Sequence, residues 1–225
     1  MVRCGMMSAM SERAAIFWTV GLAVVAVLLT ALGFARWEQP VLEAIRAGAC
    51  QSWVETARFF SRYGDFPFLL VAGVIALAIS LRLRATAWSR IFTAMILAGI
   101  LAGLASNVTK LATGRVRPRV EHTEHGWYGP KHEDRWVSVR HDFQSFPSSH
   151  AACAFGFFFP LFLSRRAVGS AGLLAAAAIA WSRVQLNAHH ISDIATGALF
   201  GVVAGWIVWR WIVVRGGLGR WLGPV

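Results

Sequence analysis

Charged residues are scarce in this chain. Asp, Glu, Lys and Arg make up 15% of its 225 residues, whereas 56% of the residues are hydrophobic and the mean hydropathy is +0.54. The apolar residues also occur in long runs, which excludes an ordinary soluble domain and predicts an integral membrane protein. The 11 tryptophans fit a protein with two membrane interfaces, where indole rings are enriched.

Cysteines are also few, and acidic residues are half as numerous as basic ones. Cys4, Cys50 and Cys153 lack the spacing of a metal site, so we expect all three to be unpaired. The 22 basic and 11 acidic residues give a net charge of +11, which is typical of nucleic-acid binding. Cytoplasmic loops of membrane proteins collect Lys and Arg as well, and we expect this second explanation to hold, with no nucleic-acid partner.

Six apolar stretches are candidate membrane spans within one domain, residues 1–225. They are Ala14–Phe34, Phe66–Leu83, Trp88–Leu111, Ser148–Ser164, Ala167–Asn187 and Asp193–Val214. A span needs about 20 residues, a length that the fourth and fifth reach only if their polar ends are helical. Pro160 predicts a kink in the fourth, and the first is too long for a signal peptide. The predicted fold is an all-α integral membrane protein with six transmembrane helices in one bundle.

The distribution of arginines predicts the orientation of these spans. With the N-terminus in the cytoplasm, the inner connections carry arginines without nearby acidic residues, as in Arg82–Arg84 and Arg165–Arg166. This pattern favours a bacterial inner membrane. The segment Trp37–Tyr63 mixes aromatic and charged residues, and we expect it to form an amphipathic helix on the outer surface. Glycines repeat every four residues at Gly99/Gly103 and Gly197/Gly201/Gly205, which allows helices to pack closely.

Three polar clusters fall at the outer ends of these spans. They are KLATGRVRPR (Lys110–Arg119), FPSSH (Phe146–His150) and SRVQLNAHHISD (Ser182–Asp193). If the topology is right, all three meet at one membrane face. Lys110, Arg117 and Arg183 then supply positive charge, and Ser148 or Ser149 is a natural N-cap for the helix that follows. Cations beside a helix N-terminus form a phosphate site, so the sequence predicts one here.

Histidines complete this constellation. His150 lies in the first turn of the fourth span, close enough to the expected phosphate to give or take a proton. Asp193 follows His189 by four residues and His190 by three, so its carboxylate can orient either imidazole. The spacing alone does not choose between these two histidines.

The residue pattern is similar to that of a known family. Lys110, six residues and Arg117-Pro118 are followed by Pro147-Ser148-Ser149-His150, and then by Ser182-Arg183, five residues, His189, three residues and Asp193. This order resembles the three-part signature of the type 2 phosphatidic acid phosphatase family, membrane lipid phosphatases related to the vanadium haloperoxidases. The signature region runs from residue 110 to residue 193. The family's membrane members also resemble this chain in having six spans.

The resemblance assigns a role to each signature residue. It implies that His189 is the nucleophile that forms a phosphohistidine, that Asp193 orients it, and that His150 is the proton donor and acceptor. It implies that the phosphate is held by Lys110, Arg117, Ser148, Ser149 and Arg183. It implies neither a metal nor a cofactor. The family usually has glycine where this chain has Ser149, which would be strained if the position required a positive φ.

The remaining outer loop, residues 121–136, is rich in histidine and acidic side chains. These residue types could bind a metal, but they lack tight ligand spacing, and we expect a solvated loop that shapes substrate access. The resemblance therefore implies a metal-independent phosphatase that acts on a lipid phosphate or diphosphate in the bilayer. Two alternatives are a lipid phosphotransferase with the same site and a non-enzymatic transporter of anionic lipids. The sequence carries no signal for the oligomeric state.

Overall fold

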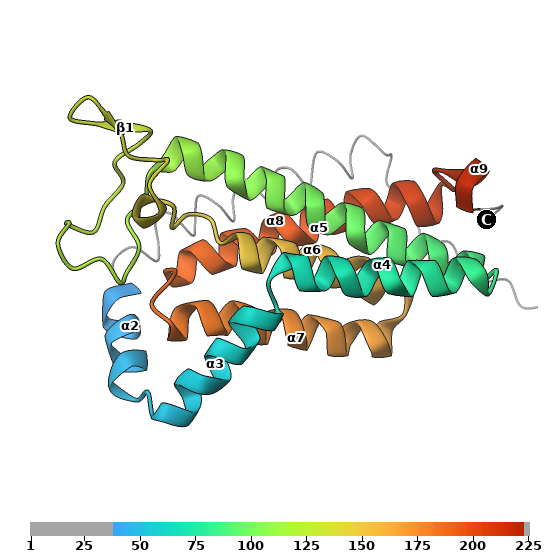
Figure 1. Ribbon diagram of the computed structural model, residues 1–225, viewed down its shortest axis with the longest axis horizontal. Coiled ribbons are helices and arrows are strands. Elements are labelled where there is room, and N and C mark those ends of the chain that lie inside the picture. Colours follow the sequence, from blue (N-terminus) through green and yellow to red (C-terminus); the bar gives the residue numbers. More distant parts are fainter. Residues whose placement is uncertain (1–37, 223–225) are drawn as a thin grey trace, which may run out of the picture.

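The computed structural model describes residues 38–222, and its longest helices run side by side (Figure 1). These helices are α4 (Phe66–Arg82), α5 (Thr86–Thr113), α6 (Ser149–Ser164), α7 (Arg166–Gln185) and α8 (Ile191–Trp209), which continues as the π-helix η2 (Arg210–Val214). Each of the five predicted spans within this range therefore coincides with a helix. The first predicted span, Ala14–Phe34, lies outside the described residues.

Not all of these helices have the length of a complete membrane span. Three are long and apolar enough to cross a bilayer alone, namely α5, α7 and α8 together with η2. A fourth would come from α3 (Gln51–Tyr63) and α4 taken together, although the two are bent by 54°. Helix α6 has 16 residues, fewer than the about 20 that a span needs. It continues through Pro160 to Ser164.

The segment predicted as one amphipathic helix is helical, but it forms two helices, so the expected continuity was wrong. Helix α2 (Glu38–Ala47) ends before Gly48, and Cys50 adopts an extended conformation with φ −90° and ψ 164° as the N-cap of α3. The chain changes direction at this break, so α2 lies beside the connection between α5 and α6 (Figure 1).

That connection, residues 114–148, also departs from the all-α expectation. It contains a hairpin in which β1 (Lys131–His132) pairs antiparallel with β2 (Arg135–Trp136), followed by the short 3₁₀-helix η1 (His141–Phe143). The two turn residues, Glu133 and Asp134, both have positive φ, as a type I′ hairpin turn requires. The Glu-Asp pair is not the Asn-Gly or Asp-Gly sequence that usually indicates such a turn, so the hairpin was not predicted.

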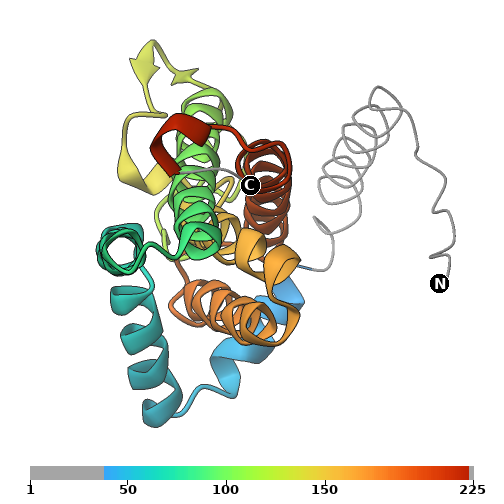
Figure 2. The ribbon, with the colours of Figure 1, turned by 90° about the vertical axis from the view of Figure 1, so that its right-hand side faces the viewer.

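Helix α6 occupies the centre of the bundle and packs against α5, α7 and α8 (Figure 2). One buried cluster joins α4, α5, α6 and α7 through Leu69, Met95, Phe157 and Ile179. On the other side of α6, a Cβ added at Gly201 of α8 would lie 2.6 Å from the Ala152 oxygen. The glycine repeat of α8 therefore allows the two backbones to approach closely, as predicted.

Three cap residues begin or end the helices that surround the site. Gly114 ends α5 in the left-handed conformation, and a Cβ there would lie 1.9 Å from the oxygen of Gly129. Asp65 caps α4, with its carboxylate accepting from the backbone N–H of Phe66. Ser148 caps α6 and accepts from the N–H of Ala151, as the sequence predicted for this serine or its neighbour.

Candidate active site

A cavity of about 400 Å³ lies at the end of the bundle where α5 ends and α6 and α8 begin. It is lined by residues of all three polar clusters, namely Lys110, Arg117, Ser149, His150, Arg183 and His189. The structure thus brings the three clusters to one place. Two other signature residues, Ser148 and Asp193, do not line the cavity and are fully buried.

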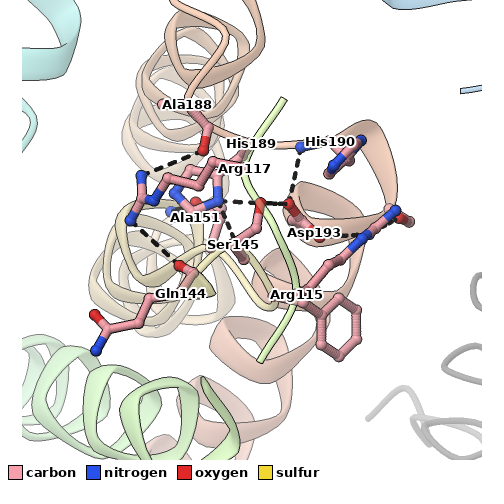
Figure 3. A network of polar contacts seen from close by, with 12 residues as sticks. Arg115, Arg117, Gln144, Ser145, Ala151, Ala188, His189, His190 and Asp193 are labelled. Atoms are coloured by element: carbon pink, nitrogen blue, oxygen red, sulfur yellow. Dashed lines mark hydrogen bonds and ion pairs between the residues drawn. The ribbon is translucent and has the colours of Figure 1, made fainter. Parts of the chain in front are cut away.

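Arg117 is held by three backbone carbonyl oxygens on two segments of the chain. Its Nε donates to His141 at 2.9 Å. Its Nη1 donates to Ala188 at 3.2 Å and its Nη2 to Gln144 at 3.2 Å (Figure 3). Burial lowers the pKa of Arg117 to about 10, which leaves the guanidinium charged at neutral pH. Because these bonds fix the group at the cavity wall, its charge is preorganised for an anion.

The other two cations come from different helices. Lys110 is in the last turn of α5, and Arg183 is in the last turn of α7, where its Nη1 donates to the hydroxyl of Ser61 in α3. Lys110 is buried, so its ammonium group reaches the site with little screening by water. Three positive charges from three segments therefore converge on one cavity, the arrangement that phosphate oxygens require.

His189 is buried and held in one orientation. Its Nδ1 lies 2.7 Å from the carbonyl oxygen of Ser145. Since a carbonyl oxygen can only accept, Nδ1 carries the hydrogen and Nε2 keeps its lone pair. Burial, reinforced by Arg117 and Lys110, lowers the pKa of His189 to about 3. The imidazole is therefore neutral and has one nitrogen available for nucleophilic attack.

Asp193 is linked to His189 mainly through Ser145. Its Oδ2 lies 3.6 Å from Nδ1 of His189, an ion-pair distance and too long for a hydrogen bond. The same oxygen accepts from the Ser145 hydroxyl at 2.5 Å and from the backbone N–H of His190 at 2.8 Å (Figure 3). Ser145 thus bonds Asp193 through its hydroxyl and His189 through its carbonyl, and it connects the two residues.

The structure distinguishes the two adjacent histidines, which spacing could not. His190 does not line the cavity; it is the N-cap of α8, and its Nε2 lies 3.1 Å from the carbonyl oxygen of Val116. His189 faces the cavity and His190 fixes the start of the helix that carries Asp193. Of the two histidines, His189 is therefore the one placed to contact a ligand in the cavity.

Arg115 was not singled out from the sequence, although it lies within the first cluster. Its Nη1 donates to Asp193 at 2.5 Å and to the Ser192 hydroxyl at 2.7 Å, and its Nη2 donates to Glu38 at 2.6 Å. Glu38 in turn accepts from the backbone N–H of Ser192 at 2.6 Å. Glu38 is 77 residues from Arg115 in sequence, so no local pattern could have indicated this buried contact.

Ser149 does not show the strain that replacement of a glycine could cause. It is the first residue of α6 and is absent from the positions with positive φ. Its hydroxyl donates to Oδ1 of Asn107 in α5 at 2.9 Å. Next to it, His150 lines the cavity, and its Nε2 lies 3.4 Å from a carboxylate oxygen of Asp65.

Residues 121–136 of the outer loop are mostly exposed. Within residues 38–222, no group of three or more His, Cys, Asp or Glu side chains is arranged to hold a metal ion. Tyr128 and His132 contact each other edge to face, with ring centroids 4.8 Å apart. The exposure of its side chains gives this loop the solvated character that the sequence predicted.

A family comparison agrees with the signature. The sequence model of the PAP2 superfamily matches residues 87–216, more than half of the chain. The chain belongs to this superfamily. The matched region contains all three polar clusters, and the membership confirms the resemblance stated from the residues. No curated protein matches the chain.

Two solved structures of PAP2-type or related proteins share the fold. The PAP2-type phosphatidylglycerolphosphate phosphatase from Bacillus subtilis superimposes with a TM-score of 0.65 at 22% identity, covering 84% of this chain and 93% of that protein. LpxE from Aquifex aeolicus gives a TM-score of 0.55 at 17% identity, covering 77% of this chain and 94% of that protein. At these identities the similarity shows the common fold.

Proposed function

We propose that this protein is a membrane lipid phosphatase that cleaves a phosphomonoester or diphosphate through a phosphohistidine on His189. The observation that carries the proposal is the neutral, oriented imidazole of His189 in a cavity with three cations. The cations would bind the phosphate oxygens and stabilise the charge of the transition state, while the imidazole supplies the nucleophile.

The wall of the cavity supports a lipid as the substrate. Beside its polar residues it contains Phe66 of α4 and Ile100 and Leu104 of α5. Ile100 is 36% exposed and Leu104 is 59% exposed, and both belong to a helix apolar enough to cross a bilayer. A phosphate bound among the cations would thus have apolar surface next to it for the attached chains. A water-soluble phosphate ester would gain nothing from this surface.

The first chemical step would transfer the phosphoryl group to the protein. Nε2 of His189 attacks phosphorus, an N–P bond forms, and the bond from phosphorus to the leaving oxygen breaks. His150 gives its proton to that oxygen, so the lipid alcohol or lipid monophosphate leaves in a protonated form. The Asp193 carboxylate, 3.6 Å from Nδ1, offsets the positive charge that develops on the imidazole.

The second step would release the phosphate. His150, now neutral, takes a proton from a water molecule as its oxygen attacks phosphorus. The N–P bond breaks, and inorganic phosphate leaves with His189 restored to its neutral form. The sum is one lipid phosphate and one water giving one lipid alcohol and one phosphate. The scheme assigns phosphate binding to Lys110, Arg117, Ser149 and Arg183, which line the cavity. Ser148, which the signature also implied, is buried as the N-cap of α6 and does not line it. No step is routed through a metal.

We also propose the membrane arrangement that the sequence predicted. The whole chain would form one six-span domain in a bacterial inner membrane, with the cavity facing the exterior. The described helices supply three spans by length and composition, or four with the bent pair. The candidate substrates are phosphatidic acid, phosphatidylglycerol phosphate, undecaprenyl diphosphate and lipid A phosphates. The named activity of the Bacillus protein makes phosphatidylglycerol phosphate the first to test.

The test is phosphate release from these lipids by purified protein in detergent with EDTA, beside the His189→Ala variant. Release that the variant loses, together with an acid-labile phosphoenzyme trapped by rapid quenching, would support the proposal. A phosphotransferase would pass the phosphoryl group to an added alcohol acceptor in preference to water. A transporter would bind the lipid without turnover and would not need His189. Equal release by parent and variant would exclude the nucleophile.

A further inference from the structure

Asp65 is a carboxylate in a cavity built for a negatively charged ligand. Among residues 38–222, it is the acidic residue that lines the cavity, where Lys110, Arg117 and Arg183 supply positive charge. A carboxylate there repels a phosphate and weakens its binding. Because this repulsion costs affinity for the phosphate, the presence of Asp65 points to a role in another step of the reaction. Asp65 lies outside the three clusters of the signature, and its sequence position before α4 gave no functional signal.

The contact that Asp65 makes indicates what that step is. Its Oδ1 lies 3.4 Å from Nε2 of His150 and accepts at 2.8 Å from the backbone N–H of Phe66. The second bond fixes the carboxylate at the N-terminus of α4, where Asp65 is the N-cap. The side chain is 49% exposed, against 21% for His150, so the pair lies at the opening of the cavity.

We propose that Asp65 is a positioning residue that orients His150 and favours its protonated form for its role as proton donor. This inference rests on the proposed phosphatase function and adds a residue to it.

The electrostatics of the cavity explain why His150 needs such a partner. Four other ionisable groups line the same cavity on neighbouring segments: Lys110 on α5, Arg117 and His141 on the connection to α6, and Arg183 on α7. His189, which precedes α8, is neutral. Positive charges oppose protonation of an imidazole, whereas a carboxylate at ion-pair distance favours it. Without Asp65, His150 would face cations alone and would lose its proton at a lower pH.

Asp65→Asn separates this role from helix capping. Asparagine caps a helix as well as aspartate does, so the bond to Phe66 is retained while the negative charge is lost. Glu55→Gln is the matched control, because Glu55 is an exposed carboxylate on α3 that contacts Gln51 and does not line the cavity. His150→Gln is measured beside them to show that the proton donor is needed.

The kinetic readouts distinguish positioning from a structural effect. We expect Asp65→Asn to lower kcat about tenfold on a lipid phosphate, which is part of the roughly 10²–10⁴-fold that general acid catalysis contributes, because His150 itself is retained. KM should stay the same or fall, because a charge that repels the substrate is gone. The basic limb of the pH profile of kcat/KM should move to lower pH. A substrate with a good leaving group, such as an aryl phosphate, should lose much less activity, because its leaving oxygen needs no proton.

An unchanged pH profile with unchanged kcat in Asp65→Asn would overturn the inference. Equal losses on the lipid and aryl substrates would also overturn it, because they would indicate a general distortion of the site. These outcomes differ from a failure of the proposed function. If the parent releases no phosphate, or His150→Gln keeps full activity, the phosphatase mechanism itself fails. If the parent needs His150 but not Asp65, the positioning role alone fails.

Discussion

Replacement of Arg115 by methionine tests whether the buried ion network behind the cavity holds the site together. The guanidinium is 8% exposed and lies between two carboxylates, Asp193 at 2.5 Å and Glu38 at 2.6 Å, whose side chains are 0% and 3% exposed. Methionine fills much of the same volume but supplies no charge and no donor. The substitution would therefore leave two buried carboxylates without their cation.

The size of the effect follows from this geometry. Removing one partner of a buried ion pair costs about 3–5 kcal/mol, because the remaining charge is desolvated without compensation. We expect Arg115→Met to lower the free energy of unfolding by that amount. Adding Glu38→Gln removes one of the two uncompensated charges and should recover about 1–2 kcal/mol, a typical coupling between contacting residues. A shift of Asp193 would also disturb Ser145 and His189, so kcat should fall about 100-fold.

The assay is unfolding by a denaturing detergent in mixed micelles, followed by circular dichroism, with phosphate release measured on the same samples. Arg135→Met is the control, because Arg135 lies exposed on β2 and takes no part in the ion pairs of the network. A loss below about 1 kcal/mol for Arg115→Met would refute the reasoning. So would a double variant whose loss is the sum of the two single losses, since additivity indicates independent sites.

Two further predictions concern packing and pH. Gly201→Ala places a Cβ 2.6 Å from both the Ala152 oxygen and the Gly156 nitrogen, so thermal unfolding should show a marked loss of stability. Gly126→Ala, whose nearest atom is 3.7 Å away, should be tolerated, and equal stability of the two variants would contradict close packing of α6 and α8. The pKa of His189 is lowered from an ordinary 6.5 to about 3 in the folded protein. Between these two pH values, the unfolded chain binds a proton at this residue and the folded chain does not. The residue's contribution to stability is complete above pH 6.5 and is lost towards pH 3, with a slope of at most about 1.4 kcal/mol per pH unit. His189→Gln should remove that part of the pH dependence, and an unchanged slope would show that the imidazole is not buried as a neutral group.

Hydrophobic runs and signature residues predicted much of this molecule. Five predicted spans coincide with helices, and the three polar clusters meet at one cavity. Apolar runs indicate membrane helices because the bilayer requires both a length and a composition, and both are visible in local sequence. The break that divides residues 38–63 into α2 and α3 and the hairpin at residues 131–136 were missed. Local sequence signals at these surface positions are weak and leave the backbone several alternatives.

The sequence by itself determined the family, the residue types of the site and the helices that carry them. These properties depend on spacing along the chain, which a signature records directly. The tertiary structure decided that His189 faces the cavity while His190 caps a helix, although the two are adjacent and both have a spacing that allows pairing with Asp193. It also brought Glu38 to Arg115 and Asp65 to His150, contacts across 77 and 85 residues. Such contacts arise only when helices pack, because the direction of a buried side chain depends on the whole surface around it.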